Sequence, residues 1–349
     1  MTDCIIVGGG LIGMLSAREL TRRGMKVVLL EKGEMGQESS WAGGGILSPL
    51  HPWRYSDKLN QLAQVGHQQY AALADELLQE GGVDPEYIRS GMLVLGSDEV
   101  DAARQWAQRW SMKLEEIDST QALQALSPGV SAQFSQGLWL PEVAQMRNPR
   151  LVRSLRTSLQ TLGIECHPHT PVEKLLLEQG RVQGVVANGR LWHAERVLIA
   201  GGAWSAELLQ ACGKAPQISP VKGQMILFKG EPGLLQHILL AENRYLIPRR
   251  DGRIVCGSTL EHSGFDKHIS DEVKTELLAS AQGIFPALSE LPVEHHWAGL
   301  RPGSPEGEPY IGEYNGVQGL YINAGHYRNG VILGLGSAQR IAQIITDQG

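Results

Sequence analysis

Cysteine is scarce in this sequence. Its four cysteines, Cys4, Cys166, Cys212 and Cys256, are scattered over 349 residues, and no two are spaced as C-x-x-C. This distribution excludes a disulfide-rich scaffold and gives no support to a zinc or other metal site. We therefore interpret the four side chains as small apolar groups of the core, and we expect no bound metal.

An excess of positive charge is also absent. The chain has 31 Lys and Arg against 37 Asp and Glu, a formal net charge of −6, which offers no basic field to nucleic acid or to an anionic membrane. No apolar run approaches the roughly 20 residues that cross a bilayer, and residues 1–3 lack the basic start of a signal peptide. The sequence therefore predicts a cytoplasmic protein that binds neither nucleic acid nor membrane.

Glycine, in contrast, is abundant, and one glycine cluster stands in an informative place. A short apolar strand, residues 4–7, runs into residues 8–13 (GGGLIG) and then into a helical pattern. Gly8 permits a sharp turn, Gly10 permits close approach of a pyrophosphate, and Gly13 permits close packing of the helix on the strand. The N–H groups at the helix start would then face the phosphates.

The next apolar strand supports the same interpretation. Residues 27–30 end on Glu31, eighteen positions after Gly13, where a carboxylate accepts hydrogen bonds from ribose hydroxyls. An acid at this place favours FAD or NAD over NADP. The alternative is a glycine-rich turn without a ligand, but the strand before it, the helix after it and the acid together favour dinucleotide binding.

A second glycine cluster follows at residues 39–47 (SSWAGGGIL). Ser39 and Ser40 offer hydroxyls to a phosphate, and three successive glycines leave the backbone open to a flat ligand. The alternative is a flexible connecting loop. Because the cluster lies directly downstream of the dinucleotide motif, we favour the ligand-binding interpretation.

The rest of the chain predicts two interleaved domains, for which 349 residues are long enough. We expect helices at residues 57–80, 98–110, 148–162, 271–284 and 329–346. We expect strands at residues 163–166, 172–177, 182–187 and 197–200 to resume the first sheet. Antiparallel strands are predicted between residues 219 and 297, where Asp251 and Gly252 mark a hairpin. The fold class is α/β (α+β overall), with a Rossmann-like domain at residues 1–85, 143–217 and 300–349 and a mainly antiparallel-sheet domain at residues 86–142 and 218–299.

Five motifs together suggest a family. They are residues 7–13 (VGGGLIG), 201–205 (GGAWS), 220–224 (PVKGQ), 297–303 (WAGLRPG) and 323–330 (NAGHYRNG). The combination resembles the D-amino-acid oxidase family of flavoproteins, in particular its thiamine-pathway branch, from about residue 3 to about residue 345. The resemblance implies an FAD-binding domain and a substrate domain, noncovalently bound FAD and a homotetramer.

The same resemblance implies an activity. It is the oxidation of glycine and other small amines, such as sarcosine and small D-amino acids, by hydride transfer to flavin N5. Molecular oxygen then takes the electrons and becomes hydrogen peroxide. No Ser-His-Asp set or pair of acids can be assembled at informative spacing, but hydride removal from a neutral amine depends mainly on positioning.

The predicted cofactor site combines the two glycine clusters with a second helix start near the C-terminus. The N–H groups of residues 325–332, aimed at the flavin, would stabilise the negative charge of its reduced form. We expect His326 to contribute its backbone rather than to act as a general base. The full predicted set is Gly8, Gly10, Leu11, Ile12, Gly13, Glu31, Lys32, Ser39, Ser40, Gly44, Gly45, Ile46, Val172, Gly202, His326, Tyr327, Arg328, Asn329, Gly330, Val331 and Ile332.

Arg301 is the predicted anchor of the substrate carboxylate. Its small neighbours Gly299 and Gly303 leave room for the guanidinium to reach into a cleft and to form two parallel hydrogen bonds. On the residues alone, a surface ion pair with Glu306 or Glu308 is the more common arrangement. The resemblance, in which the matching arginine binds the carboxylate, favours the anchor.

Two further residues complete the predicted catalytic set with Arg301. Tyr245 resembles a tyrosine whose hydroxyl donates to the carboxylate, although a strand tyrosine more often only packs. Arg328 resembles a residue close to flavin and substrate, and its alternative role is an inter-domain ion pair. Asn243, Arg244 and Leu260 are expected to line or border the substrate pocket.

Two other functions agree with the same motifs. One is a flavin dehydrogenase of D-amino acids that passes electrons to a membrane quinone, against which stands the lack of a membrane-binding segment. The other is a non-catalytic FAD-binding subunit of a larger complex. Peroxide yield and the bleaching of flavin by glycine distinguish these functions from an oxidase.

Overall fold

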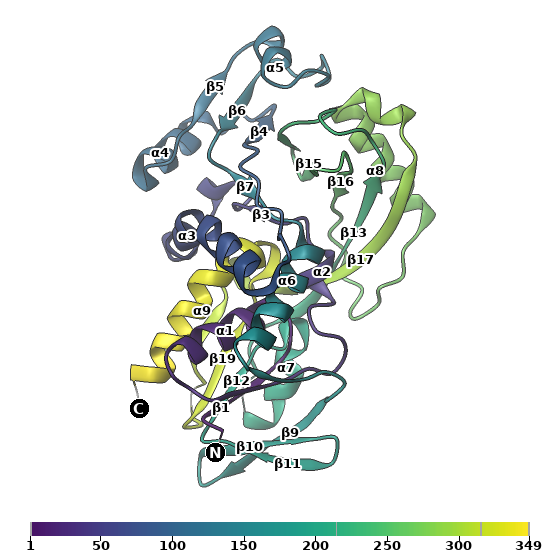
Figure 1. Cartoon of the computed structure of the whole chain (residues 1–349). Helices are drawn as coiled ribbons and strands as arrows, with labels where there is room; N and C mark the ends of the chain where they lie inside the picture. The colour runs from purple at the N-terminus through teal and green to yellow at the C-terminus, as the bar shows by residue number, and fades with distance from the viewer. Residues whose placement is uncertain (1, 214, 315, 348–349) are drawn as a thin grey trace.

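The structure is a computed structural model, and it describes residues 2–213, 215–314 and 316–347. Two large sheets lie one above the other, with helices packed around the lower sheet and beside the upper one (Figure 1). In the described part of the chain, no helix combines the length and the apolar character that crossing a membrane requires.

The first sheet has six strands in the order β18-β19-β12-β1-β2-β8. They are β18 (Tyr310–Glu313), β19 (Leu320–Ala324), β12 (Arg196–Ile199), β1 (Cys4–Val7), β2 (Val27–Leu30) and β8 (Glu165–His167). All neighbouring pairs are parallel except the antiparallel edge pair of β18 and β19. Such a parallel sheet must be covered on both faces, which explains the uninterrupted apolar runs of β1 and β2.

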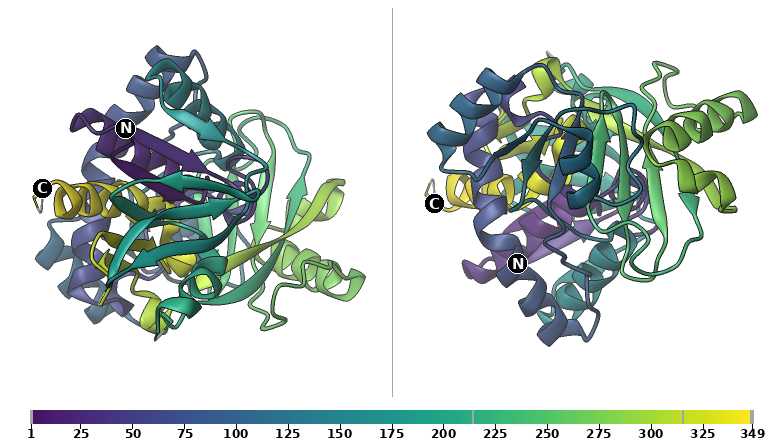
Figure 2. Two further views of the ribbon diagram at one scale, coloured as in Figure 1. Left: turned by 90° about the horizontal axis from the view of Figure 1, so that it is seen from below. Right: turned by 90° about the horizontal axis from the view of Figure 1, so that it is seen from above.

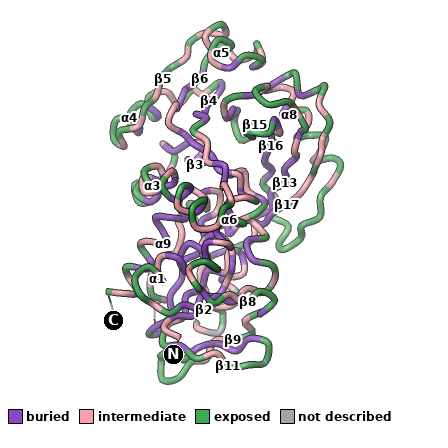
Figure 3. Tube along the Cα trace, in the orientation of Figure 1, coloured by how far each residue is buried: buried purple, intermediate pink, exposed green. Residues whose placement is uncertain are grey.

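Helices cover one face of this sheet, and they are α1 (Leu11–Arg22), α3 (Asp57–Gly81), α6 (Asn148–Thr161) and α9 (Gly330–Asp347). Cys4 and Ile6 of β1 point into the core that these helices form, whereas Ile5 and Val7 point into the core on the opposite face. This alternation is the period of two expected of a strand. Buried residues accordingly concentrate on the strands and on the inner sides of the helices (Figure 3).

A separate three-stranded sheet covers the opposite face, with the order β11-β10-β9 (Figure 2, left). Its strands are β9 (Val172–Glu178), β10 (Arg181–Ala187) and β11 (Arg190–His193). The expectation that residues 172–177 and 182–187 resume the first sheet is therefore wrong, and only β8 and β12 do so. The reason is local. Gln179 and Gly180 both have positive φ, at 49° and 77°, and such a two-residue turn makes an antiparallel hairpin.

The second sheet has eight strands in the order β17-β13-β16-β15-β14-β4-β6-β5. They are β17 (Val293–Gly303), β13 (Ser219–Phe228), β16 (Ile254–Gly257), β15 (Arg244–Pro248), β14 (Ile238–Ala241), β4 (Met92–Leu95), β6 (Gly137–Leu140) and β5 (Glu115–Ile117). All neighbours are antiparallel except β14 and β4. Helix α4 (Val100–Trp110) packs on one face, and α8 (Asp271–Ile284) packs on the other.

The predicted helices are all present, with ends shifted by a few residues. Ser56 caps α3 by accepting a hydrogen bond from the Leu59 N–H at 3.4 Å, and Gly82 ends it in the left-handed conformation. The predicted hairpin at Asp251 and Gly252 joins β15 to β16. The remaining elements are α2 (Ser39–Ala42), β3 (Ile46–Leu47), η1 (Pro52–Arg54), α5 (Thr120–Leu126), β7 (Ala144–Gln145), η2 (Gly202–Trp204), α7 (Ser205–Leu209), η3 (Gln210–Cys212), η4 (Pro286–Glu290), η5 (Pro305–Gly307) and η6 (Tyr327–Asn329).

The mixed α/β class and the Rossmann-like sheet beside a mainly antiparallel sheet are confirmed. We propose the domain ranges given above because the first sheet draws its strands from residues 1–85, 143–217 and 300–349. The second sheet draws its strands from the two remaining ranges, except that β17 (Val293–Gly303) continues across position 300.

Candidate cofactor and substrate site

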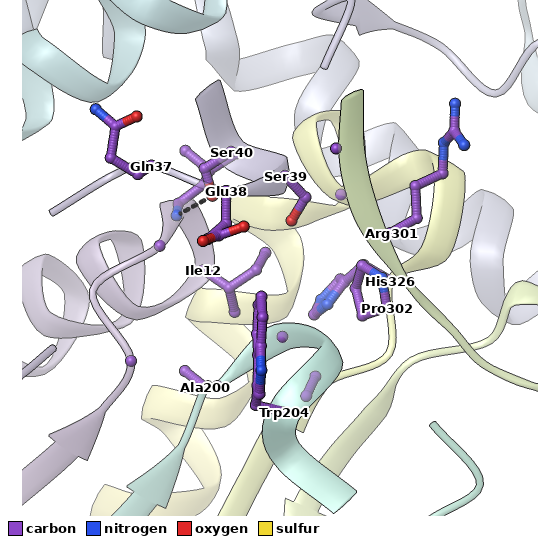
Figure 4. A pocket seen from close by; sticks show the side chains of 18 of the residues that line it. Ile12, Gln37, Glu38, Ser39, Ser40, Ala200, Trp204, Arg301, Pro302 and His326 are labelled. Carbon is purple, nitrogen blue, oxygen red and sulfur yellow. Dashed lines mark hydrogen bonds between the residues drawn. The ribbon is translucent and has the colours of Figure 1, made fainter. Parts of the chain in front are cut away.

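A cavity of about 680 Å³ lies between the two large sheets, and this size is typical of ligand-binding pockets. Its lining comes from the carboxyl ends of β1, β2, β12 and β19 and from β13, β15 and β17 of the second sheet. In open α/β folds, ligands bind at this edge of the sheet. Figure 4 shows side chains from β17 and from the helices and turns that follow strands of the first sheet.

The turn after β1 is shaped by the absence of side chains. Gly8 has a φ of +115°, and a Cβ there would lie 2.4 Å from the carbonyl oxygen of Ala200. A Cβ on Gly13 would lie 1.9 Å from the carbonyl oxygen of Gly8, so only glycine lets α1 pack this closely. For Gly10, chain neighbours aside, Oγ of Ser40 at 3.0 Å is the one atom of the described residues within 4 Å of such a Cβ. The turn therefore leaves space at the start of α1.

Ser40 is fixed at this helix start by a backbone hydrogen bond. The N–H of Leu11 donates to Oγ of Ser40 at 2.8 Å, drawn as the dashed line in Figure 4. A hydroxyl has one hydrogen to donate in addition to its two acceptor sites, so the Ser40 hydroxyl keeps a donor for an anion. Residues 39–42, for which a loop was the alternative, form the short helix α2.

The carboxylate of Glu31 is held by two backbone donors. Its Oε2 accepts from the Gly9 N–H at 2.6 Å, and its Oε1 accepts from the Gly33 N–H at 2.9 Å. These bonds fix the acid at the end of β2, where it lines the cavity. Beside it, the ammonium of Lys32 lies 3.2 Å from the centre of the Trp204 ring, and burial lowers the pKa of Lys32.

Three asparagines that line the cavity each have a buried side-chain atom without a hydrogen-bond partner among the described residues. Oδ1 of Asn148, Oδ1 of Asn323 and Nδ2 of Asn329 are buried without a hydrogen-bond partner, and all three residues line the cavity. An unpaired buried polar group costs about 1–3 kcal/mol, and a polar ligand that reached these atoms would offset that cost. Asn148 and Asn323 were not predicted as site residues, although Asn323 begins the motif of residues 323–330 and Asn148 begins a predicted helix.

Most of the predicted cofactor residues line the cavity, and two do not. Gly13 lies behind it because its role is to pack against Gly8. Ile332 is directed into the core, where its backbone oxygen would lie 2.4 Å from a Cβ on Gly66 of α3. Gly202 has a φ of +56°, and apart from its chain neighbours no atom in the described part of the chain would lie within 4 Å of a Cβ there, so this turn also presents bare backbone.

Arg301, on β17, lines the same cavity. Figure 4 shows its side chain extending from the strand, with the guanidinium apart from the other labelled side chains. Its Nη1 donates to the carbonyl oxygen of Thr259 at 3.2 Å, and its Nη2 donates to Oγ of Ser258. Among the described residues, no carboxylate lies within ion-pair distance of this group. The alternative, a surface ion pair of Arg301 with Glu306 or Glu308, is not formed. The carboxylate of Glu308 instead lies 4.0 Å from Nζ of Lys58.

The surroundings of Arg301 suit the binding of a further partner, from outside the protein, to its guanidinium. Burial lowers the pKa of Arg301, and Tyr245 beside it opposes this shift. Tyr245 is buried, and its hydroxyl donates to Sδ of Met225 at 3.7 Å. A thioether is a weak acceptor, so a carboxylate would be a stronger partner for this hydroxyl.

The second helix start has the form that the sequence predicted. Residues Tyr327–Asn329 make one 3-10 turn, and α9 follows from Gly330. The ring of His326 is buried against the hydroxyl of Ser337 at 3.0 Å, and burial lowers the pKa of His326 to about 3. The imidazole is therefore neutral. Arg328 lines the cavity and forms no ion pair with any described residue.

The three residues expected to border the substrate pocket are displaced from it. Arg244 points to the other side of β15, where Nη1 donates to the carbonyl oxygen of Ser258 at 2.8 Å and Nη2 pairs with Glu276. Leu260 and Asn243 are exposed. None of the three lines the cavity. Strand position alone did not show which face each side chain takes.

The cavity therefore combines a dinucleotide-binding turn, bare backbone on two further turns and a guanidinium that lacks a carboxylate. A family model described as FAD dependent oxidoreductase matches residues 3–344. The chain belongs to this family, it is an enzyme of the FAD-dependent oxidoreductase class, and FAD is its cofactor. The unsatisfied asparagines and the bare turns fit such a cofactor.

Glycine oxidases are among its relatives. The glycine oxidase of Pseudomonas aeruginosa is 48% identical, over 98% of this chain and 94% of that protein. The solved structure of glycine oxidase from Bacillus cereus superimposes with a TM-score of 0.93 at 31% identity, covering 100% of this chain and 96% of that one. The bifunctional protein ThiO/ThiG of Synechocystis is 30% identical over 99% of this chain, which spans 52% of that longer protein.

Proposed function

We propose that this protein oxidises glycine and other small amines, including sarcosine and small D-amino acids. Glycine, water and oxygen would give glyoxylate, ammonia and hydrogen peroxide, and an N-alkylated substrate would release the primary amine instead of ammonia. The observation that carries the proposal is the guanidinium of Arg301, which faces the cavity beside the Tyr245 hydroxyl and lacks a carboxylate among the described residues. The similarity to glycine oxidases supports the choice of substrate.

The hydrogen bonds of Arg301 leave it suited to bind a carboxylate. Each terminal nitrogen of a guanidinium carries two hydrogens, and the protein uses each nitrogen once, for Thr259 and for Ser258. One hydrogen on each nitrogen remains for two parallel bonds to a carboxylate, the strong bidentate arrangement. Tyr245 would add a third donor to the same carboxylate.

The cofactor would be held along the same cavity. The start of α1 would bind the pyrophosphate, Glu31 the ribose hydroxyls, and the asparagines Asn148, Asn323 and Asn329 further polar groups of FAD. When bound, FAD accepts a hydride equivalent at flavin N5 and passes two electrons to oxygen. We propose that the attachment is noncovalent, because no cysteine is found among the described residues that line the cavity.

The chain's own contribution to the reaction would be positioning. Among the described residues, no carboxylate forms an ion pair with Arg301. Burial lowers the pKa of His326 to about 3 and its ring is bonded to Ser337, so this imidazole would be a weak general base. Substrate held by its carboxylate would place its α-carbon at one point in the cavity, and such orientation accounts for a large part of catalysis in enzymes. The amine would enter in its neutral form and leave as an imine that water hydrolyses.

We further propose that the product serves thiamine thiazole synthesis, supported by the similarity to bifunctional ThiO/ThiG proteins. A cytoplasmic location and a homotetramer stay predictions. The test of the main proposal is a panel of glycine, sarcosine and D-alanine offered to the FAD-loaded protein. Peroxide should form with the small substrates, and anaerobic glycine should bleach the visible flavin band. Bleaching without peroxide would favour a dehydrogenase, and no bleaching would favour a non-catalytic subunit.

A further inference from the structure

Arg249 is a buried cation whose direct partners are all neutral. It follows β15 and is only 7% exposed. Its Nη2 donates to the carbonyl oxygen of Gly44 at 2.7 Å, and its Nη1 donates to Oε1 of Gln145 at 2.8 Å and to the carbonyl oxygen of Met146 at 3.1 Å. Burial lowers the pKa of Arg249 to about 10, so it remains charged. A buried cation is costly to keep, which argues for a specific role.

The three acceptors belong to two segments that meet at the cavity. We call residues 43–45 the glycine loop, and all three of its glycines line the cavity. The loop leads into β3, which pairs with β7 so that Ile46 stands opposite Gln145. The Met146 N–H also donates to the carbonyl oxygen of Gly45 at 2.9 Å. Arg249 therefore ties the glycine loop to the segment that opens α6.

The same face of β15 also reaches the substrate site. Side chains at every second strand position point to one side, and Tyr245, Ile247 and Arg249 all contact the glycine loop. A Cβ on Gly44 would lie 2.6 Å from Cδ1 of Ile247 and 3.3 Å from Cε2 of Tyr245. Of these three side chains, Arg249 makes the polar contact with the glycine loop. We infer that this contact sets the distance between the loop and Tyr245.

We propose that Arg249 is a positioning residue, which holds the glycine loop in its place at the cofactor from the neighbouring substrate domain. The inference rests on the proposed placement of FAD in this cavity, and it does not depend on which amine is oxidised. Without the guanidinium, the carbonyl groups of Gly44 and Met146 would lose their donor, and the loop would no longer be fixed against β15. The cofactor would then bind less tightly and in a changed environment.

The experiment compares Arg249→Met and Arg249→Lys with the matched control Arg253→Met. Arg253 is in the same hairpin, but it pairs with Glu294 at 2.5 Å and with Asp251 at 2.9 Å and has no bond to the glycine loop. The dissociation constant of FAD is measured by the loss of its fluorescence on binding to apoprotein. The absorption band of the bound flavin is recorded as a second readout, which general destabilisation does not shift.

For Arg249→Met, we expect FAD affinity to fall about tenfold or more, the equivalent of about 1.4 kcal/mol, and the absorption band to move. Arg249→Lys keeps the charge but reaches fewer acceptors, so its affinity should lie between those of Arg249→Met and the wild type. Arg253→Met should bind FAD like the wild type and keep its spectrum.

Wild-type affinity and an unmoved band in Arg249→Met would overturn the inference. If Arg249→Met does not fold, Arg249→Lys decides, and wild-type affinity in that variant would likewise overturn it. Neither readout uses an amine. A protein that binds FAD through Arg249 but leaves glycine untouched would therefore contradict the proposed function and leave this inference intact.

Discussion

Gly223 offers a way to move the substrate anchor without removing it. It stands on β13 opposite Gly299 of β17, and the guanidinium of Arg301 lies directly over it. A Cβ on Gly223 would lie 2.1 Å from Nη1 and 2.3 Å from Nη2 of Arg301. No nearer backbone atom opposes the added methyl group, and the guanidinium is the end of a flexible side chain. In Gly223→Ala we therefore expect Arg301 to swing aside while the sheet keeps its fold.

The size of the effect follows from the bonds that the displaced guanidinium would lose. Truncating one partner of a buried charge-assisted pair costs about 2–5 kcal/mol, and this sets the loss expected for Arg301→Ala. Gly223→Ala keeps the charge nearby and loses the geometry, for which about 1.5–3 kcal/mol is the appropriate range. The apparent KM for glycine should therefore rise by about 10-fold to 100-fold. FAD affinity should not change, because Gly223 has no part in the predicted cofactor contacts.

Peroxide release at varied glycine concentration gives KM and kcat for the wild type, Gly223→Ala and Arg301→Ala. Binding of acetate, followed by the perturbation of the flavin spectrum, reports the carboxylate site without turnover. We expect both variants to lose acetate binding, Arg301→Ala more than Gly223→Ala. If Gly223→Ala shows the KM and acetate affinity of the wild type, the assignment of this guanidinium to the carboxylate is wrong.

Three further predictions concern single side chains. Tyr245→Phe keeps the packing on Gly44 but removes one donor, so KM for glycine should rise by the equivalent of about 0.5–1.5 kcal/mol, and an unchanged KM would exclude a contact with the carboxylate. Glu31→Gln leaves one of its two backbone donors without an acceptor and weakens the ribose contact; FAD titration should show weaker binding, and wild-type affinity would contradict the role of this acid. Burial lowers the pKa of His326 in the folded protein to about 3, below its value of about 6.5 in the unfolded chain. Below about pH 6.5 the unfolded chain therefore binds a proton that the folded protein does not. The free energy of unfolding falls as the pH drops below that value. Urea unfolding at pH 7.5 and pH 5 should therefore show a smaller decrease in the free energy of unfolding for His326→Asn than for the wild type. Equal decreases would show that His326 does not cause the effect.

The parts of the site that the sequence predicted were inferred from the spacing of residues close together in the chain. The turn at residues 8–13 and the acid at Glu31 belong to one strand-turn-helix-strand unit, so their relation was readable from neighbouring letters. The anchor Arg301 was suggested by small neighbours and by a family resemblance. Its lack of an ion pair depends on residues 258 and 259, more than forty positions away, and no pattern in the sequence indicated that contact.

Long-range contacts explain what was missed. Asn148 and Asn323 line the cavity because separate strands and helices bring them there, and an asparagine carries no sequence signal for an unsatisfied oxygen. Residues 172–187 were assigned to the wrong sheet because an apolar strand reads alike in a parallel or an antiparallel setting. The positive φ of Gln179, which decides the hairpin, is not a property that glutamine suggests.

Strand β17 (Val293–Gly303) is shared between the two halves of the molecule. Besides pairing with β13, it contacts α2, the Gly202–Trp204 turn and the Tyr327–Asn329 turn, all on the side of the first sheet. Arg301 thus lies on a continuous strand that packs against both halves of the molecule. A hinge motion that separated the two halves would have to bend β17 and would displace Arg301. We therefore expect small molecules to enter and leave through movements of side chains and short loops at the rim of the cavity, without separation of the two halves.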